Sequence, residues 1–426
     1  MNLMRFAYAL LTYLLSPVYA LYWLFRGISE RAYLDRFGQR FGFGYPKLAG
    51  GCIWIHAVSV GEVQASAPLV RALAKQFPER HLLITTVTPT GAARVSKLFG
   101  DAVTHCYMPF ETPHSVRNFF VATGPRLALV METEIWPNLY YACGKRNIPL
   151  ILVSARISPK SVVSYRRMLP LFRETLSYGI VIAAQSAADA DRFRSLGTSP
   201  ERTWVTGNIK FDIELDPRLA EKGRDERQRL FGSRPVWIAA STHEGEEEQI
   251  LSAHRMLQAK LPDALLIMVP RHPERFAAVR SLLKKQQFNI VARTDESPCS
   301  AQTEVFLGDT MGEVPLFYAA SDLAFVGGTL VPIGGHNLLE PAALGRPIIT
   351  GPHLFNTQEI ADMFAELGAS RVVKSDTELA TTLHELFCDR QKADDIGARG
   401  QQIVQKNRGS LQRLLLLLEP LLRNVS

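Results

Sequence analysis

The distribution of hydrophobic and polar residues predicts two successive α/β units. Beyond Gly51, short apolar runs that suit buried strands alternate with longer stretches of helical spacing. The first series is CIWIHAV, HLLITTV, RLALVMETE, LILVSAR, GIVIAAQS and RTWVTGN, and the second is PVWIAAST, ALLIMVPRH, FNIVART, EVFLGDT, DLAFVGG, PIITG and SRVVKS. Strands that alternate with helices form mostly parallel sheets covered on both faces. We therefore expect an α/β protein with two doubly wound, Rossmann-like domains.

A polar and charged stretch at residues 212–235 separates the two series and indicates the domain boundary. We expect a membrane-associated apolar helix at 1–30, an N-terminal Rossmann-like domain at 31–212 and a C-terminal one at 213–405. A packing helix at 406–426 completes the chain. Its leucine-rich part, Leu411 to Leu422, contains Glu419-Pro420 and is too short to cross a bilayer.

The N-terminal segment from Phe6 to Phe25 has 20 residues without a charge, which is long enough to span a bilayer. Several Tyr residues, Trp23 and a central Pro17 are instead typical of a helix that lies in the membrane interface. Arginines follow closely, and they would either mark the cytoplasmic side or bind anionic head groups. A cleaved signal peptide is a third alternative. Membrane attachment through residues 1–26 is the prediction we favour.

Composition narrows the functional classes. The chain has 426 residues and a net charge of +7, and residues 1–215 hold 24 Lys/Arg against 14 Asp/Glu. This basic first half favours an anionic membrane surface or acidic substrate over nucleic acid, because no nucleic-acid-binding motif is present. The five cysteines show no CxxC spacing, which is typical of a reducing compartment and argues against a disulfide framework or a zinc site.

The stretch 323–352, LAFVGGTLVPIGGHNLLEPAALGRPIITGP, predicts a nucleotide site. A buried strand leads through glycines to a helix that should begin near His336 or Asn337 and end at Gly345. Free N–H groups at such a helix start suit a phosphate or carboxylate. Glu340 suits a vicinal diol such as a ribose, because a carboxylate only accepts hydrogen bonds. Alternatively, the glycines only shape a tight strand–helix connection.

Carboxylates follow the strands of the first unit, where ligands of doubly wound sheets bind. Glu62 stands at a predicted helix start, as a candidate general base or as a residue that only complements the helix dipole. Glu132 and Glu134 follow another strand, and Lys210 follows the last one, where it could also be a solvated cation.

The second unit offers phosphate chemistry at the same positions. The segment Ser241 to Gly245 could bind phosphate or cap a helix. Arg271 has the side chain best shaped for phosphate, and His272 beside it is a second candidate. Residues 308–313 open another helix. No metal-binding spacing is present, so we predict no metal and no cofactor.

Carboxylates in a basic first unit and phosphate-binding groups in the second suggest group transfer across an interdomain cleft. The segments SVGE, TPTG, METEIWPN, TGNIKFD, STHEGEEE, VPRHPERF, GDTMGE, FVGGTL and GGHNLLEPAALGRP, in this order, resemble the 3-deoxy-D-manno-octulosonic acid (Kdo) transferases of lipopolysaccharide assembly. The resemblance covers nearly the whole chain. It implies a GT-B glycosyltransferase with two domains facing a cleft, which moves Kdo from CMP-Kdo to the tetra-acylated lipid A precursor on the cytoplasmic face of the inner membrane.

The resemblance also implies roles for individual residues. Glu62 matches the family's proposed catalytic base, and Glu132 and Lys210 match residues thought to support the transition state. The CMP contacts match Pro270, Arg271, Met311, Gly312, Glu313, Asn337, Leu338, Leu339 and Glu340. Leu338 departs from a relative that has proline there, which a backbone contact would tolerate. Lys210 could stabilise the leaving phosphate or hold the Kdo carboxylate.

Two other functions remain open from the sequence. A non-hydrolysing UDP-sugar epimerase has a similar two-lobe architecture but needs no membrane segment. A membrane-bound nucleotide-sugar-binding protein without catalysis would bind CMP-Kdo and release no CMP. The sequence does not determine how many Kdo residues are transferred.

Overall fold

The computed structural model describes residues 3–166 and 169–423, and it folds into two compact units. The first unit comprises Met1–Asp212 together with Asn407–Ser426, and the second comprises Ile213–Lys406. The first unit is therefore built from two separated stretches of chain. Residues 1–2 of the predicted apolar helix and residues 424–426 of the predicted packing helix lie outside the described residues.

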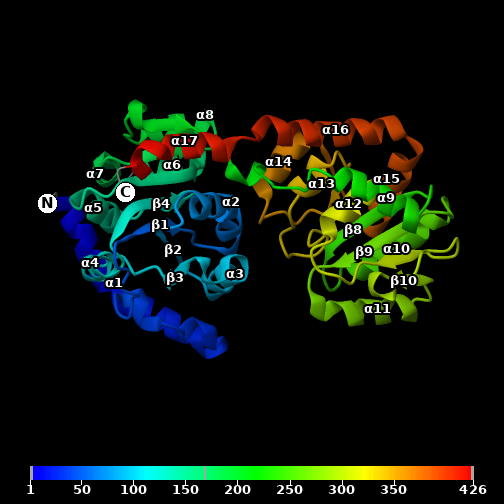
Figure 1. Ribbon diagram of the computed structural model, residues 1–426, viewed down its shortest axis with the longest axis horizontal. Coiled ribbons are helices and arrows are strands. Elements are labelled where there is room, and N and C mark those ends of the chain that lie inside the picture. The colour runs from blue at the N-terminus through cyan, green and yellow to red at the C-terminus, as the bar shows by residue number, and fades with distance from the viewer. Residues whose placement is uncertain (1–2, 167–168, 424–426) are drawn as a thin grey trace. The chain divides into compact units, whose positions relative to one another are not determined.

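The first unit contains a seven-stranded parallel sheet in the order β3-β2-β1-β4-β5-β6-β7 (Figure 1). Its strands are β1 (Cys52–His56), β2 (His81–Thr86), β3 (Thr104–Tyr107), β4 (Pro125–Met131), β5 (Leu150–Ala155), β6 (Val181–Ala184) and β7 (Thr203–Val205). Its α-helices are α1 (Leu3–Ser29), α2 (Val60–Gln76), α3 (Pro89–Phe99), α4 (Pro113–Thr123), α5 (Pro137–Lys145), α6 (Pro159–Arg166), α7 (Leu169–Ser177), α8 (Ala187–Ser195) and α17 (Ser410–Arg423). Short 3-10 helices are η1 (Arg31–Leu34), η2 (Phe37–Phe41), η3 (Gly100–Ala102), η4 (Pro200–Arg202) and η5 (Ile209–Phe211).

The second unit repeats this design with the strand order β10-β11-β9-β8-β12-β13-β14, again parallel throughout. Its strands are β8 (Val236–Thr242), β9 (Leu265–Pro270), β10 (Ile290–Ala292), β11 (Val305–Leu307), β12 (Leu323–Val326), β13 (Ile348–Thr350) and β14 (Ser370–Val372). Its helices are α9 (Leu219–Leu230), α10 (Glu247–Gln258), α11 (Phe276–Lys285), α12 (Val314–Ala320), α13 (Leu339–Ala343), α14 (Gln358–Glu366), α15 (Asp376–Cys388) and α16 (Arg390–Asn407), with η6 (Pro273–Arg275) and η7 (Arg293–Asp295).

Both faces of each sheet are buried, which explains the continuous apolar runs. In β1, Trp54 packs into the core on one face of the sheet, while Ile53 and Ile55 pack into the core on the other. Trp237 and Ile238 divide between the two faces of the second sheet in the same way. The expected α/β class with two doubly wound sheets is confirmed.

The sequence reading missed β3 and misplaced one helix boundary. β3 is short and carries Thr104 and His105 at an edge of the sheet, so it lacks the apolar run of a central strand. The helix expected from His336 or Asn337 begins at Leu339, because Gly334 and Gly335 hold positive φ angles of 106° and 81° and extend the loop.

Helix α1 is attached to the first unit along much of its length. The Arg5 guanidinium lies over the Tyr141 ring, 2.9 Å from its centroid, and the Tyr8 hydroxyl donates to the buried carboxylate of Glu111. Further along, Tyr19 stacks on Phe110, and Trp23 is 4% exposed beneath Arg40. One face of α1 is thus fixed to the protein.

The opposite face of α1 carries exposed apolar side chains, among them Leu14 and Leu21, which are 66% and 65% exposed. By length and composition, α1 is the one helix among the described residues that could cross a membrane. It could therefore associate with one.

The C-terminal helix α17 belongs to the first unit. Leu414, Leu418 and Leu422 recur every fourth residue and join the core that includes β1 and α2. The Asp212 carboxylate accepts hydrogen bonds from the N–H groups of Gly409 and Leu411, both at 2.6 Å, and so satisfies the start of α17. Figure 1 shows α17 in red among the elements of the first unit.

Candidate active site

Glu62 lies where the sequence places it, in the first turn of α2 directly after β1. The Val58 N–H donates to Glu62 Oε2 at 2.8 Å, and the Ser59 hydroxyl donates to Oε1 at 3.3 Å. In return, the Glu62 N–H donates to Ser59 Oγ at 3.4 Å. With Ser59 as the N-cap of α2, these hydrogen bonds orient the carboxyl group at the carboxyl edge of the sheet.

Glu132 lies at the end of β4, which neighbours β1 in the sheet. The strand order reverses between β1 and β4, and ligands of doubly wound sheets bind at such a switch point. Glu132 holds a left-handed backbone with φ of 55°, a costly conformation for a residue other than glycine. The fold thus brings Glu62 and Glu132 to one place from sequence positions 70 residues apart.

Two cations hold the Glu132 carboxylate. Lys210 Nζ donates to Oε1 at 2.7 Å and Arg156 Nε donates to Oε2 at 2.8 Å. Burial alone would raise the pKa of Glu132, but Lys210 and Arg156 keep the pKa below its ordinary value. Glu132 therefore remains ionised and keeps Lys210 in place. Lys210 is not the freely solvated cation that the sequence left as an alternative.

The carboxyl group of Glu62 has the opposite electrostatic character. Burial, with a smaller contribution from the nearby carboxylates Glu132 and Glu134, raises its pKa to about 7 against the lowering effect of the Val58 and Ser59 hydrogen bonds. Burial also raises the pKa of Glu134, which accepts a hydrogen bond from the Trp136 indole at 2.8 Å. A carboxyl group that titrates near neutral pH is suited to take a proton from a hydroxyl group.

In the second unit, basic side chains gather at the ends of β8, β9 and β12, again at the switch point of the sheet. His243 follows β8, Arg271 and His272 follow β9, and His336 follows β12. His243 Nε2 and His336 Nε2 lie 2.7 Å apart, and the His272 ring packs edge-on against His243. The Arg271 guanidinium forms no hydrogen bond or ion pair with any residue of the described ranges 3–166 and 169–423. This unpaired cation is available to an anionic ligand.

The glycine loop after β12 does not offer its first N–H groups to a ligand. The buried Glu246 carboxylate accepts hydrogen bonds from the N–H groups of Gly328, Thr329 and Leu330, at 2.7 to 2.9 Å. A side chain at Gly327 would lie 2.5 Å from the Ser241 carbonyl oxygen, so the close approach of these loops requires glycine there. The anion that the glycine loop binds at these positions is a carboxylate of the protein itself.

Glu340 lies in the first turn of α13, and its carboxylate accepts from the Asn337 amide at 3.0 Å. Burial raises the pKa of Glu340, while Asn337 and the charge of Arg271 lower it. Arg271 therefore lies close enough to act on both Glu340 and His336. Pro270, Leu338 and Leu339 are buried around them and contribute backbone rather than side-chain polar groups.

The predicted contacts at Met311, Gly312 and Glu313 follow β11, the strand beyond β9. Met311 is 52% exposed, and Gly312 has a φ of 88°. The Glu313 carboxylate accepts from Arg293 Nη2 at 2.7 Å and from the Thr310 hydroxyl. It is thus already engaged within the protein, and a ligand at this loop would meet backbone groups and Met311.

Sequence reasoning did not single out several residues of these two sites. Arg156 lay inside a predicted strand run, Glu246 inside an acidic stretch, and His336 inside the glycine loop. For Glu246 the available signal was one acidic residue just after a glycine, which does not reveal its loop partner 82 residues away. No group of three or more His, Cys, Asp or Glu suited to a metal ion is found in the described part of the chain.

Comparisons with known proteins show the family of the chain. Residues 35–213 match the family model described as 3-deoxy-D-manno-octulosonic-acid transferase (kdotransferase). The 3-deoxy-D-manno-octulosonic acid transferase of Haemophilus influenzae is 42% identical over 99% of this chain and 100% of its own length. The chain belongs to this family. It is a glycosyltransferase, and the resemblance seen in the sequence motifs is confirmed.

A second relative agrees with the assignment to the Kdo transferase family, and a solved structure agrees with the fold. The enzyme of the same name from Bordetella pertussis is 35% identical over 90% of each chain. The crystal structure of UDP-GlcNAc 2-epimerase from Neisseria meningitidis bound to UDP-GlcNAc covers 85% of this chain and 99% of its own, with a TM-score of 0.52 and 16% identity. That likeness shows the shared two-unit α/β fold alone.

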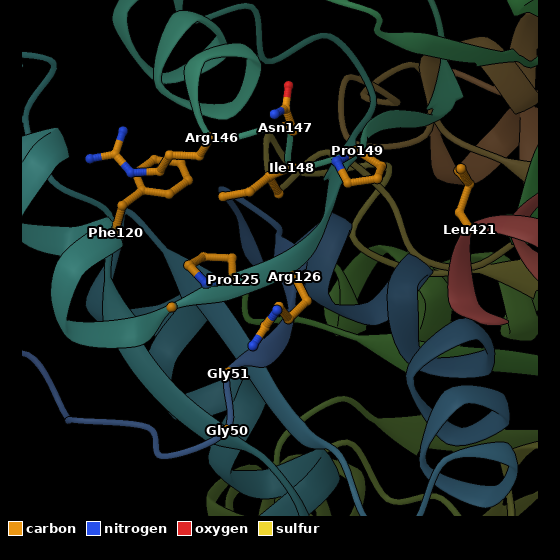
Figure 2. A pocket seen from close by; sticks show the side chains of 11 residues that line it. Gly50, Gly51, Phe120, Pro125, Arg126, Arg146, Asn147, Ile148, Pro149 and Leu421 are labelled. Carbon is orange, nitrogen blue, oxygen red and sulfur yellow. The ribbon is translucent and has the colours of Figure 1, made fainter. Parts of the chain in front are cut away.

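The first unit of this Kdo transferase family member also contains a pocket of about 630 Å³ (Figure 2). The pocket lies near the starts of β1, β4 and β5, at the end of the strands opposite to Glu62. Its lining includes Gly51, Phe120, Arg126 and Arg146, and none of the predicted site residues. Because ligands of parallel sheets bind beyond the carboxyl ends of the strands, Glu62 is a stronger candidate for the active site than this pocket.

Proposed function

We propose that the protein transfers Kdo from CMP-Kdo to the tetra-acylated lipid A precursor with inversion at the anomeric carbon. Glu62 removes the proton from an acceptor hydroxyl group, the oxygen attacks the anomeric carbon of Kdo, and CMP leaves from the opposite face. The observation that carries this mechanism is the carboxyl group of Glu62, which is held by hydrogen bonds from Val58 and Ser59 at a switch point and has a pKa of about 7. A single base is what an inverting displacement requires.

Lys210 and Glu132 support the reaction in this proposal. The Lys210 ammonium, held by Glu132, offers a positive charge at this edge of the sheet for the phosphate that leaves or for the Kdo carboxylate. No cofactor or metal takes part in the proposed reaction, because the cations of the site can meet the charge that develops.

The donor is proposed to bind in the second unit. Glu340 accepts the ribose hydroxyl groups, and Arg271 meets the phosphate, with backbone groups of Pro270, Met311, Gly312, Asn337, Leu338 and Leu339 completing the CMP site. Transfer requires that Glu62 and the donor site face one gap during the reaction.

The enzyme is proposed to work on the cytoplasmic face of the inner membrane, with α1 lying in the membrane interface. A helix that contacts Tyr141, Glu111 and Phe110 on one face cannot cross the hydrocarbon without carrying polar groups of the first unit with it. Its exposed apolar face and the basic character of residues 1–215 suit an anionic bilayer surface.

The deciding experiment combines the purified protein with CMP-Kdo and the tetra-acylated precursor and analyses the lipid by mass spectrometry. We expect a Kdo-bearing lipid and released CMP, and nuclear magnetic resonance of the product should show an inverted anomeric configuration. Release of CMP without a new lipid, or a retained configuration, would contradict the proposal. Conversion of a UDP-sugar without any lipid would indicate an epimerase instead.

Replacement of the base provides the matching test at one residue. Glu62→Gln should lower kcat by about 10²- to 10⁴-fold, because general-base assistance is lost, while the affinity for CMP-Kdo changes little. In the unsubstituted protein, kcat/KM should decline below a pH of about 7, where Glu62 becomes protonated. Glu79→Gln, at an exposed carboxylate beyond α2, is the control. Full activity of Glu62→Gln would rule out the assigned role.

A further inference from the structure

The histidine pair of the second unit has a geometry that requires a proton between two rings. His243 Nε2 and His336 Nε2 lie 2.7 Å apart, and the rings are within 5° of parallel. Two nitrogen lone pairs cannot face each other at this distance, so one Nε2 carries a proton and the other accepts it. When both rings are neutral, the accepting ring must carry its own proton on Nδ1.

The surroundings keep this pair uncharged when no ligand is bound. Burial, the charge of Arg271 and the neighbouring imidazoles lower the pKa of His336 to about 3. Burial, His272, Arg271 and Arg275 lower the pKa of His243 to about 4. Arg275 is itself paired with Glu244 and Glu247, which leaves Arg271 as the cation without a partner among the described residues.

Acidic groups also face the pair. Glu246 accepts from the backbone N–H of His243 at 3.4 Å and is bound to the glycine loop by three further hydrogen bonds, while the Glu340 carboxylate lies within the electrostatic reach of Arg271. Since Arg271 acts on Glu340 and on both histidines, an anion that binds to Arg271 beside a ribose at Glu340 comes next to the histidine pair.

We propose that His243 and His336 form a proton-sharing pair that gains one proton from solvent when the phosphate of the donor nucleotide binds at Arg271. The inference rests on the proposed donor site and assigns a positioning role to two histidines that the nucleotide contacts described above do not include. An anion neutralises the field of Arg271, so the charged form of the pair becomes favourable. The pair then adds a hydrogen-bonded positive charge beside the phosphate that must later leave with CMP.

Proton uptake on binding makes the affinity for the phosphate depend on pH. The complex holds one more proton than the free protein, so affinity for the phosphate must rise as pH falls. The limit for one linked proton is about tenfold per pH unit. Protonation of Glu340 affects the unsubstituted protein and histidine variants alike, so a difference between them reports on the pair.

The test uses the full chain in detergent and the methyl phosphodiester of CMP, which carries one negative charge at every pH used. Its affinity is measured by calorimetry between pH 7.5 and 5.0, and at pH 6 in two buffers of different ionisation enthalpy. We expect tighter binding at lower pH with net proton uptake. The dependence should disappear in His243→Gln and His336→Gln, because glutamine keeps an N–H donor but cannot gain a proton. Cytidine, which has no phosphate, should show no uptake.

The controls distinguish failure of the proposed histidine pair from failure of the proposed donor site. His81→Gln, at an exposed histidine of the first unit, should behave as the unsubstituted protein. Binding of the probe without proton uptake in the unsubstituted protein, or uptake retained in both glutamine variants, would overturn the inference and leave the donor site standing. No binding to the unsubstituted protein would overturn the donor site and the inference together. The two-buffer measurement needs no variant, so a folding defect does not weaken it.

Discussion

The chemistry of Glu62 depends on residues that surround its carboxyl group. Glu132 sits beside it as a carboxylate that stays ionised, because Lys210 and Arg156 hold it at 2.7 and 2.8 Å. That negative charge helps to raise the pKa of Glu62. A base that titrates near neutral pH and a partner that stays ionised therefore arise from the same residue type through different neighbours.

Glu132→Gln should shift the pH dependence of the reaction to lower pH. Removing the Glu132 charge lowers the pKa of Glu62, and the positive charges of Lys210 and Arg156, no longer offset by Glu132, lower it further. The acid limb of kcat/KM, measured from pH 5.5 to 8.5, should therefore move downwards, and the plateau should fall because a weaker base remains. An acid limb that stays in place or moves upwards would show that Glu132 does not act on Glu62. Glu79→Gln again serves as the reference.

Single residues were predictable where their chemistry follows a strand. Glu62, Glu132 and Lys210 were each identified because they follow apolar runs. The ion pair between Glu132 and Lys210 was not predicted, since the two residues are separated by 78 positions and meet only when β4 and the segment after β7 end at the same edge.

At the scale of elements, loops are organised by buried carboxylates as much as by glycines. Glu246 replaces a bound anion at the glycine loop, accepting from three consecutive N–H groups. Asp212 likewise accepts hydrogen bonds from two backbone N–H groups at the start of α17. In both cases a long-range contact satisfies backbone donors that would otherwise be buried without partners.

Glu246→Gln should destabilise the second unit. An amide has one oxygen in place of two, so at least one loop N–H would lose its acceptor, at a cost of about 1–3 kcal/mol per buried group. Thermal unfolding followed with and without CMP would measure this loss. Glu248→Gln, at an exposed carboxylate on the same helix, is the matched control and should be nearly neutral. Equal stability of the two variants would refute the role of Glu246.

The contribution of α17 to the stability of the first unit can be tested at two leucines. Leu418 is fully buried in the core beside β1, whereas Leu416 on the same helix is 59% exposed. Leu418→Ala should destabilise the first unit by about 2–5 kcal/mol through lost burial and a cavity. Leu416→Ala should cost less than about 0.5 kcal/mol. Limited proteolysis and chemical unfolding would compare them, and equal effects would contradict the packing role.

At the scale of the whole molecule, α1 is both a part of the first unit and a candidate membrane contact. On its buried face, the Tyr8 hydroxyl donates a hydrogen bond to the Glu111 carboxylate. Burial raises the pKa of Glu111 to about 7. Deleting residues 1–25 would therefore remove a structural partner as well as the apolar face. Substitutions on the exposed face test membrane association more cleanly than a deletion.

Leu14→Glu combined with Leu21→Glu should weaken binding to vesicles that contain anionic lipid, because two charges would enter the apolar interface. Flotation with vesicles measures the bound fraction, and activity on a detergent-dispersed acceptor should change much less. Leu367→Glu, at an exposed leucine of the second unit, is the control. Unchanged flotation of the double variant would contradict attachment through this face.

The sequence by itself determined the fold class, the family and most of the chemistry at the strand ends, because buried parallel strands are continuous apolar runs and ligand groups follow them. Only the tertiary structure decided which of these groups act together. Four contacts join residues that are remote in sequence: the ion pair of Glu132 with Lys210, the hydrogen bonds of Glu246 to the glycine loop, the contact of His243 with His336, and the packing of α17 on the first unit. Such contacts depend on strand order and helix packing, which local patterns of hydrophobicity do not specify.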